Sequence, residues 1–375
     1  MSWEKVKLGD VADSCLGKML DQVKNKGEYE PYLANLNVRW GYFELDNLSQ
    51  MRFESGEQER YGLKYGDLVI CEGGEPGRCA IWKDQIPNMK IQKALHRVRV
   101  HDCLDYRYLY YWFLYAGQTK ALEQYFTGAT IKHMPGDKLK SICIDFPPKE
   151  EQQRISEILW PIDSLIENNQ KQIKLLEEAA QRLYKEWFVD LRFPGHETTH
   201  IVDGIPEGWH CVRITDLLEI KYGKDHKSLE NGNIPAYGSG GIIRNVNKVI
   251  YSGESVLIPR KGSLNNIMLV NGDFWTIDTM FFTIPQCPNI TKYVYLYLAG
   301  VDMYAMNIGA AVPSMTVKIL DGMKLLCPSS EILEQFENKV SSCFSLINRR
   351  KEMNRDLGRA RDLLLSKLMN KEIEV

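Results

Sequence analysis

Apolar side chains recur at three- and four-residue intervals in two long stretches of the chain, residues 148–192 and 328–375. Each stretch begins at a proline and continues through charged and amide residues. A spacing close to 3.5 residues is typical of a helix that packs against another helix in a coiled coil. The apolar positions assigned to this helix–helix seam are Ile158, Ile162, Leu165, Leu176, Leu183, Phe336, Val340, Ile347, Leu357 and Leu364. The pattern therefore predicts two long helices, each of which closes one half of the chain.

Pro161 interrupts the first of these two patterns. Proline lacks a backbone N–H and clashes with the preceding turn, which costs about 3 kcal/mol in a helix interior. We therefore expect a kink at Pro161, with a short helix that ends at Trp160 and a longer helix from Ile162 to about Phe188. Asn169 lies on the predicted seam, where an amide weakens the contact but can fix its register.

The remaining parts of the chain, residues 1–147 and 193–327, show shorter patterns. Short apolar or alternating segments between glycine, proline and aspartate turns, for example at residues 68–71 and 95–100, predict β-strands. An aromatic-rich segment at residues 106–123 predicts one helix, whose aromatic side chains are expected to form core. Each of these parts is thus expected to be a mixed, mostly β domain, and residues 193–327 begin with a polar linker.

The second half of the sequence repeats the first. Residues 208–217 resemble residues 2–11, residues 252–258 resemble 65–70, and residues 308–312 resemble 127–131. The offset between the copies falls from 206 residues (208 against 2) to 181 residues (308 against 127). The second copy is therefore the shorter one. Together these patterns predict an α+β molecule with internal pseudo-twofold symmetry and a helical rod in its middle.

Composition limits the kind of protein that this chain can be. Among 375 residues, 44% are hydrophobic and 26% are charged, which is ordinary for a globular protein of two or three domains. No apolar run approaches the roughly 20 residues that span a bilayer, and no secretory leader is recognisable. Nine cysteines lie scattered without a CxxC pair, which indicates reduced thiols and a cytoplasmic location.

One motif matches the zincin signature HExxH, at residues 196–200. A zinc hydrolase needs both histidines on one face of a helix, with the glutamate beside the metal-bound water. Here the motif follows a Pro-Gly pair and lies in the predicted linker. A zinc site formed by His196 and His200 is therefore the least favoured alternative. The chain also has no P-loop, so the sequence predicts neither a catalytic site nor a metal site.

Basic and amide side chains gather instead in the predicted loops of both halves. Such groups contact phosphates and can make paired hydrogen bonds to guanine or adenine edges. The candidate DNA-binding residues are Arg39, Lys64, Arg78, Lys93, Lys132, His133, Arg244, Lys248, Arg260, Lys261, Asn265 and Lys318. For each of them, an ordinary solvated surface group is the alternative interpretation.

Several short motifs occur in a fixed order along the chain. They are GDLV at residues 66–69, TGAT at 127–130, FPPKEEQ at 146–152, WFVD at 187–190, FPG at 193–195 and IPEGW at 205–209. In this order, and half repeated, they resemble the specificity subunit of type I restriction–modification systems over essentially the whole chain. The second copy departs from the pattern at Gly309-Ala310-Ala311 and at residues 327–331.

The resemblance implies a division into a target recognition domain at residues 1–147, a central helical region at 148–192, a linker and second recognition domain at 193–327, and a distal helical region at 328–375. Two antiparallel helices would hold the domains apart, and each domain would read one half of a bipartite site in double-stranded DNA. Two methyltransferase subunits would dock on the helices, bind S-adenosylmethionine and methylate adenine. Restriction subunits using ATP and Mg would join them, while this chain would carry no catalytic site.

Two other interpretations share the same architecture. The chain could serve a bipartite-site type II enzyme in which methylase and nuclease are one polypeptide. It could also be a stand-alone coiled-coil protein that binds DNA without catalytic partners. A pull-down distinguishes them by the number and size of the co-purifying proteins.

Overall fold

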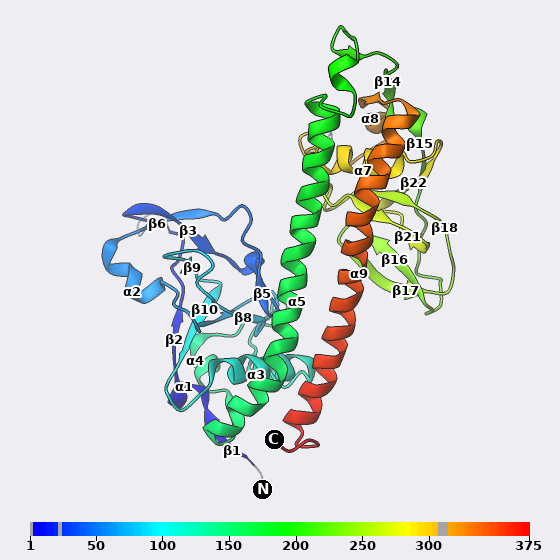
Figure 1. Ribbon diagram of the computed structural model, residues 1–375. Helices are drawn as coiled ribbons and strands as arrows, with labels where there is room; N and C mark the ends of the chain where they lie inside the picture. Colours follow the sequence, from blue (N-terminus) through cyan, green and yellow to red (C-terminus); the bar gives the residue numbers. More distant parts are fainter. Residues whose placement is uncertain (1–2, 22–24, 307–313) are drawn as a thin grey trace. The chain divides into compact units, whose positions relative to one another are not determined.

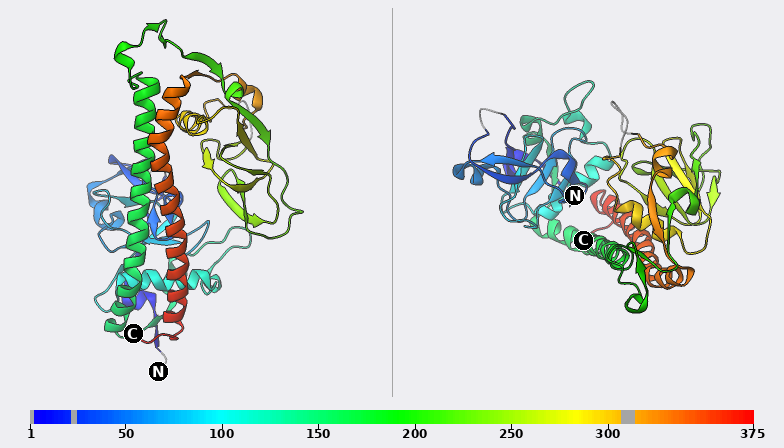
Figure 2. Two further views of the ribbon diagram at one scale, coloured as in Figure 1. Left: turned by 45° about the vertical axis from the view of Figure 1, so that its right-hand side comes forward. Right: turned by 90° about the horizontal axis from the view of Figure 1, so that it is seen from above.

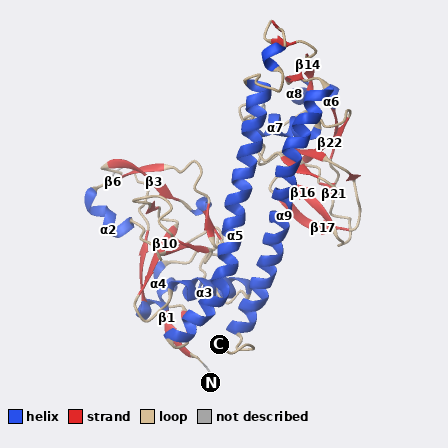
Figure 3. Cartoon of the chain, in the orientation of Figure 1, coloured by secondary structure: helices blue, strands red, loops and turns tan. Residues whose placement is uncertain are grey.

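The computed structural model describes residues 3–21, 25–306 and 314–375. The chain forms two compact units: unit 1 is Met1–Gln170 with Lys351–Val375, and unit 2 is Lys171–Arg350. The division runs through both long helices, α5 (Lys149–Tyr184) and α9 (Ser330–Met369) (Figure 1). Each unit therefore combines strands and short helices with one segment of each long helix, and we call the part outside the long helices its head (Figure 3).

The head of unit 1 is built on a four-stranded antiparallel sheet in the order β2-β10-β7-β8. Its strands are β2 (Ala12–Leu16), β10 (Leu95–Val100), β7 (Leu68–Cys71) and β8 (Cys79–Ile81). All four residues of β7 are buried, which explains why this strand reads as an unbroken apolar run. The helix α3 (Tyr106–Gln118) packs its aromatic residues into the same core.

Smaller elements complete this head. They are β1 (Glu4–Lys7) paired with β11 (Cys143–Phe146), the sheet β6 (Gln50–Phe53)-β3 (Glu28–Leu33)-β9 (Lys90–Ile91), the hairpin β4 (Val38–Arg39)-β5 (Tyr42–Phe43), and the helices α1 (Leu8–Val11), α2 (Gln58–Tyr61), α4 (Gly136–Lys140), η1 (Asn35–Asn37), η2 (Ser55–Glu57) and η3 (Glu123–Tyr125). The three-stranded sheet has its own small core around Met51 and Phe53.

Unit 2 repeats the main sheet in the order β15-β22-β19-β20. The strands are β15 (Leu218–Tyr222), β22 (Met280–Pro285), β19 (Ser255–Pro259) and β20 (Met268–Val270). A second sheet consists of β17 (Gly241–Val246), β16 (Ile234–Gly238), β21 (Asp273–Thr276) and β18 (Tyr251–Ser252). The remaining elements are β14 (His210–Arg213) paired with β23 (Lys324–Cys327), β12 (Ile201–Val202) paired with β13 (Ile205–Pro206), α6 (Ile214–Leu217), α7 (Thr291–Ala299), α8 (Val317–Asp321), η4 (Lys185–Val189) and η5 (His196–Thr198).

The two heads correspond residue by residue where their sheets match. In unit 1, His96 pairs with Leu16 on one side and Ile70 on the other; in unit 2, Phe281 pairs with Tyr222 and Ile258. Tyr108 at the start of α3 donates its hydroxyl proton to the carbonyl of Asp145, and Tyr293 of α7 donates to the carbonyl of Leu326. The prediction of an α+β chain with a repeated fold is confirmed. The repeat segment at residues 309–311 lies outside the described residues.

A buried glutamine ties the start of α5 to the head of unit 1. Gln152, fully buried, donates to the carbonyl of Pro147 and accepts a hydrogen bond from the backbone of Asp105. The Asp105 carboxylate in turn caps α3 by accepting from the backbone N–H groups of Arg107 and Tyr108. This chain of contacts gives a physical role to the glutamine in the FPPKEEQ segment.

In unit 1, the first turns of α5 lie beside the last turns of α9 in antiparallel orientation (Figure 2). Asp163 contacts Arg361, whereas Asn169, further along α5, contacts Asn354, which precedes Arg361 on α9. The buried apolar positions on this part of α5 are Ile155 and Leu159. The packed positions of α5 are therefore 155, 159, 162, 166 and 169, which follow one another at alternating intervals of four and three residues.

This register corrects part of the predicted seam. Ile158 and Leu165 are 38% and 41% exposed, so they lie outside the packed face of α5. Ile162 is half-buried on the packed face, as are Leu357 and Leu364 on α9. The prediction was wrong at the two exposed positions because each has an apolar neighbour, Leu159 and Ile166, that fits the same period one residue later.

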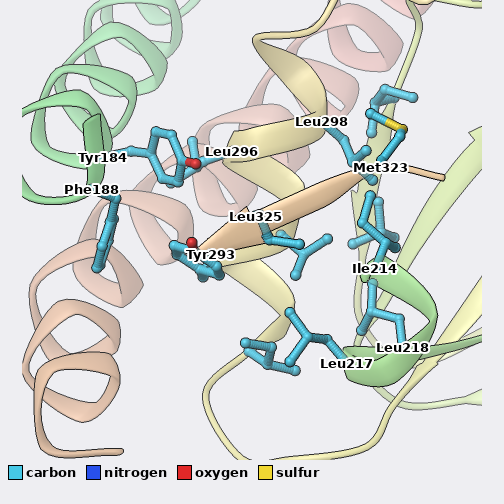
Figure 4. Packing of buried hydrophobic residues seen from close by; sticks show 14 of the residues in the cluster. Tyr184, Phe188, Ile214, Leu217, Leu218, Tyr293, Leu296, Leu298, Met323 and Leu325 are labelled. Atoms are coloured by element: carbon cyan, nitrogen blue, oxygen red, sulfur yellow. The ribbon is translucent and has the colours of Figure 1, made fainter. Parts of the chain in front are cut away.

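The second half of the seam lies in the core of unit 2. Phe336, Val340 and Ile347 of α9 are buried in one cluster, against which Leu176 and Leu183 of α5 pack. Figure 4 shows the neighbouring part of this core, where Tyr184 of α5 and Phe188 of η4 face Tyr293 and Leu296 of α7. The ring centroids of Phe188 and Tyr293 are 4.7 Å apart, in an edge-to-face arrangement.

Contrary to the prediction from the sequence, Pro161 does not divide the first long helix into two helices. α5 is continuous from Lys149 to Tyr184 with Pro161 inside it, and the π-helical turn η4 follows it. The missing hydrogen bond of Pro161 is offset by neighbours on both sides: Leu159 is fully buried, and Asp163 is held by Tyr111 and Arg361. Packing that fixes the turns before and after a proline can override its helix-breaking preference.

Candidate nucleic-acid interface

In unit 1, a loop at residues 72–78 leaves the end of β7 and meets the segment at residues 127–134. The backbone N–H of Met134 donates to the carbonyl of Glu72 at 2.7 Å, and His133 lies 3.2 Å from the Glu72 carboxylate, measured from Nδ1 to Oε2. A Cβ at Gly73 would lie 2.9 Å from this imidazole Nδ1, so glycine permits the close approach. The loop therefore presents a carboxylate and an imidazole side by side.

A second group of polar side chains supports the same loop. Arg78 binds the Glu75 carboxylate at 2.9 Å and also donates to the Asn35 side chain at 2.8 Å. Trp40 donates its indole N–H to the other oxygen of Glu75 at 2.7 Å. Arg78, one of the candidate DNA-binding residues, is thus committed to holding the loop together, and only 15% of its side chain is exposed.

In unit 2, the corresponding loop follows β19 and begins at Arg260. The backbone N–H of Met315 donates to the carbonyl of Arg260 at 2.9 Å, repeating the contact between Met134 and Glu72. The guanidinium carbon lies 4.8 Å from the ring centroid of Tyr222 and 5.3 Å from that of Phe281. Nη1 donates to the carbonyl of Asp278 at 2.7 Å. The loop of unit 2 therefore presents a guanidinium against two aromatic rings.

The other candidate cations of unit 1 lie on the surface, and most have carboxylate partners. Arg39 forms a two-pronged pair with Glu44, with N–O distances of 3.1 and 3.0 Å. Lys64 lies 3.8 Å from Glu59 and Lys132 lies 3.6 Å from Glu123, both at exposed positions. Lys93 is exposed, and the carbonyl of the next residue, Ala94, accepts a hydrogen bond from the backbone N–H of Glu72. Exposed pairs of this kind cost little to open when a phosphate approaches.

The candidates of unit 2 divide into exposed lysines and structural side chains. Lys248, Lys261 and Lys318 are exposed. Arg244 donates to the carbonyl of Leu229, and Asn265 accepts from the backbone of Met303 at 2.8 Å. These two side chains stabilise loops within the head. The DNA contacts of all twelve candidates stay predictions.

Sequence reasoning missed Glu72, Tyr222 and His96. An acidic, an aromatic and a buried imidazole side chain do not stand out in a search for cations. The signal that could have found Glu72 was the repeat: residues 252–258 end at Ile258 opposite Ile70, and this offset of 188 residues places Arg260 opposite Glu72, as the strand pairing does. His96 is buried, and burial lowers its pKa, so the imidazole is neutral at neutral pH.

A polar cluster joins the head of unit 1 to both long helices. Arg361 of α9 binds the Asp163 carboxylate of α5 at 2.7 Å, and Tyr111 of α3 donates to the other Asp163 oxygen at 2.9 Å. Lys83 binds Glu167 of α5. Burial alone would lower the pKa of Arg361, but the adjacent Asp163 carboxylate outweighs it and the pKa is raised. Arg361 is therefore permanently charged at this junction.

The HExxH segment does not have the geometry of a zinc site. His196 and Thr198 belong to a single 3-10 turn, and the His196 imidazole Nδ1 lies 2.9 Å from the carbonyl oxygen of Phe193. Across residues 3–21, 25–306 and 314–375, no group of three His, Cys, Asp or Glu side chains is placed to hold a metal ion. In the same residues, no helix is long and apolar enough to cross a membrane.

Comparison with known proteins agrees with the duplicated fold. The profile of the family described as the type I restriction modification DNA specificity domain matches residues 1–178 and 206–352. The MjaIX specificity subunit of Methanocaldococcus jannaschii is 27% identical over 83% of this chain and 78% of its own length. The MjaVIII specificity subunit of the same organism is 24% identical over 100% of this chain and 93% of its own.

A solved structure shares the fold. The type I restriction-modification S subunit from M. genitalium superposes with a TM-score of 0.57 at 20% sequence identity, over 98% of this chain and 96% of that one. The family profile covers both copies of the internal repeat, in agreement with the two heads of the structure. The chain therefore belongs to the type I restriction–modification DNA specificity family, as a specificity subunit.

Proposed function

We propose that each head contacts one half of a bipartite site in double-stranded DNA. The observation that carries this proposal is the repeat of one sheet, β2-β10-β7-β8 in unit 1 and β15-β22-β19-β20 in unit 2, with different side chains on equivalent loops. One fold with two loop chemistries suits the recognition of two different short sequences. Each correct base contact discriminates by roughly 1–3 kcal/mol, so joining two weak readers in one chain multiplies their selectivity.

The long helices are the proposed docking site for two methyltransferase subunits. Leu165 of α5 and Leu346 of α9 are 181 positions apart, the same offset as Asp145 and Leu326, and they are 41% and 45% exposed. An exposed leucine at the same position of each helix gives a partner subunit an equivalent apolar contact on each unit. The relatives from Methanocaldococcus jannaschii are named as subunits of restriction enzymes, which supports such an assembly.

In this assembly the chain supplies no catalytic group. Methyltransferase partners bind S-adenosylmethionine and methylate adenine, and restriction partners use ATP and Mg. The complex works in the cytoplasm, where its chromosomal target lies. A single large methylase–nuclease partner is the second candidate arrangement, and the apolar helix face fits either kind of partner. Co-purification distinguishes them: two copies of a methyltransferase of ordinary size support the proposal, and one nuclease-containing partner supports the alternative.

The helices are also proposed to set the distance between half-sites, because α5 and α9 each contribute to both units. The test is an insertion of four residues after Asn169, combined with four after Arg350, the equivalent position on α9. Methylated sites are then mapped by sequencing DNA exposed to the complex with its methyltransferase. We expect both half-sequences to persist and the gap between them to change.

A matched insertion after Gly204, in the exposed turn between β12 and β13, should leave the gap unchanged. A change in the half-sequences themselves would show that the helices do not act as a spacer. If the wild-type complex methylates no two-part site at all, the proposed function itself is wrong.

A further inference from the structure

The two heads carry opposite charges at one topological position. Strand pairing aligns Ile70 with Ile258, because His96 and Phe281 occupy the same place in the two sheets. Two residues further along, Glu72 of unit 1 therefore corresponds to Arg260 of unit 2. The hydrogen bonds from Met134 and Met315 to these two carbonyls establish the same equivalence independently.

Arg260 is held in place by contacts that leave part of its guanidinium available. The rings of Tyr222 and Phe281, whose centroids are 5.0 Å apart, lie beside its guanidinium carbon, and the Asp278 carbonyl accepts from Nη1. Among the described residues, this is the one hydrogen bond of the guanidinium, and the buried Nε has no partner. A guanidinium already held beside two aromatic rings loses little conformational freedom on binding, which favours the planar, two-pronged recognition that arginine makes with guanine O6 and N7.

The surroundings of Arg260 resemble a nucleic-acid surface. Tyr222 is 53% exposed at the end of β15, and Lys224 and Lys261 are exposed on the two adjoining loops. Lysines beside an arginine that stacks on an aromatic ring can contact phosphates while the guanidinium reaches a base edge. At the position of Tyr222, unit 1 has Leu16, which is 44% exposed and apolar.

Glu72 is positioned differently in unit 1. Its carboxylate lies beside His133, is 23% exposed, and has Lys93 and Lys132 on the adjoining segments. A carboxylate accepts hydrogen bonds and donates none, so at a base edge it pairs with an exocyclic amino group, the N4 of cytosine or the N6 of adenine. It disfavours the acceptor-rich edge of guanine for the same reason.

We propose that this loop position determines base specificity in both heads: Arg260 reads a guanine in one half-site, and Glu72 reads an exocyclic amino group in the other. The inference rests on the proposed function, and it adds the two residues and the chemistry of the bases that they select. It also explains why the loop begins at the end of the central strand, which fixes its backbone through the Met134 and Met315 hydrogen bonds.

The experiment maps methylated sites for complexes that contain the wild-type chain, Arg260→Gln, Arg260→Lys or Glu72→Gln with the same methyltransferase. For Arg260→Gln we expect one guanine position in one half-site to relax by about ten- to a hundredfold in relative methylation. Arg260→Lys keeps the charge but loses the planar fork, so the same position should relax less. Glu72→Gln should alter one position in the other half-site.

Arg213→Lys is the matched control, since Arg213 is an exposed arginine of the same head that is paired with Asp216 at 2.8 Å. Its methylation pattern should equal that of the wild type. A uniform loss across all sites in Arg260→Gln would mean a phosphate contact and overturn the proposal, as would an unchanged pattern at normal activity. Both of these outcomes contradict only the assignment of the base contacts. As long as the wild-type complex methylates a two-part site, the proposed function still holds. Thermal unfolding of each variant separates a folding defect from altered recognition. Arg260→Lys keeps a cation beside the aromatic rings, so it keeps the test decisive if Arg260→Gln unfolds.

Discussion

Asn169 of α5 donates its side-chain N–H to the amide oxygen of Asn354 of α9, at 2.7 Å, inside the packed helix contact of unit 1. Asn169 is 1% exposed, and Asn354 donates in turn to the carbonyl of Ile166 at 3.3 Å. Turns of apolar side chains lie on both sides of this pair. A buried amide pair of this kind is satisfied in one register only, so it selects the alignment of the two helices.

Asn354→Leu should destabilise unit 1 by about 1–3 kcal/mol, because it removes the acceptor of a buried amide donor. The double variant Asn169→Leu with Asn354→Leu should recover most of this loss, since both polar groups are then replaced by apolar ones. Urea denaturation followed by tryptophan fluorescence measures both effects. If the double variant is no more stable than Asn354→Leu, the pair does not act as a unit.

Arg361→Gln should cost roughly 3 kcal/mol, at the low end for breaking a buried ion pair. The Asp163 side chain is 19% exposed, and the substitution leaves its charge without the guanidinium. The control on the same helix is Arg359→Gln, whose partner Asp356 is 77% exposed and which should change the free energy of unfolding by less than about 0.5 kcal/mol. Equal effects in the two variants would refute a structural role for the junction.

The stability of unit 1 should fall as the pH drops below about 6.5, because of His96. Burial lowers the pKa of His96 in the folded state below the ordinary histidine value of 6.5. When the pH falls below 6.5, the unfolded chain therefore binds a proton at this imidazole while the folded chain does not. The free energy of unfolding therefore decreases between that value and the lowered pKa. His96→Phe, which copies Phe281 of unit 2, should remove this slope in denaturation curves recorded from pH 7.5 down to about 5.5.

His210→Phe is the control for the pH experiment, since His210 is exposed on β14. It should keep the slope of the wild type. A His96→Phe variant with an unchanged slope would mean that another group causes the acid sensitivity.

Two glycines at equivalent positions should tolerate no side chain. A Cβ at Gly17, after β2, would overlap the carbonyl oxygen of Gln92, and a Cβ at Gly223, after β15, would overlap that of Ile277. Gly17→Ala and Gly223→Ala should each cost about 1–3 kcal/mol, because backbone must move to make room. Gly240→Ala, with no atom within 4 Å of the new Cβ, is the control and should be neutral in thermal unfolding.

The contrast between helix and loop shows how far sequence reasoning reaches. The long helices could be predicted because one apolar residue per turn is a local pattern repeated many times. At Ile158 and Leu165 the sequence could not show which of two adjacent apolar residues lies on the packed face. Both residues fit the same period, and only the partner helix decides between them. Pro161 was misjudged for a similar reason: the cost of a proline is local, whereas the contacts of Leu159 and Asp163 that offset it come from other elements.

The sequence alone determined the repeat, the two long helices, the mostly β heads and the family. Each of these features requires particular residue types at regular intervals along the chain, and such a pattern can be read without knowing the contacts. Tertiary structure decided which side chains meet. The offset between the copies drifts along the sequence, so it is the strand pairing that fixes Glu72 and Arg260 at one position of the two sheets. Likewise, the junction of Asp163 with Arg361 joins residues 198 positions apart, a contact that depends on how the helices pack and not on any local pattern.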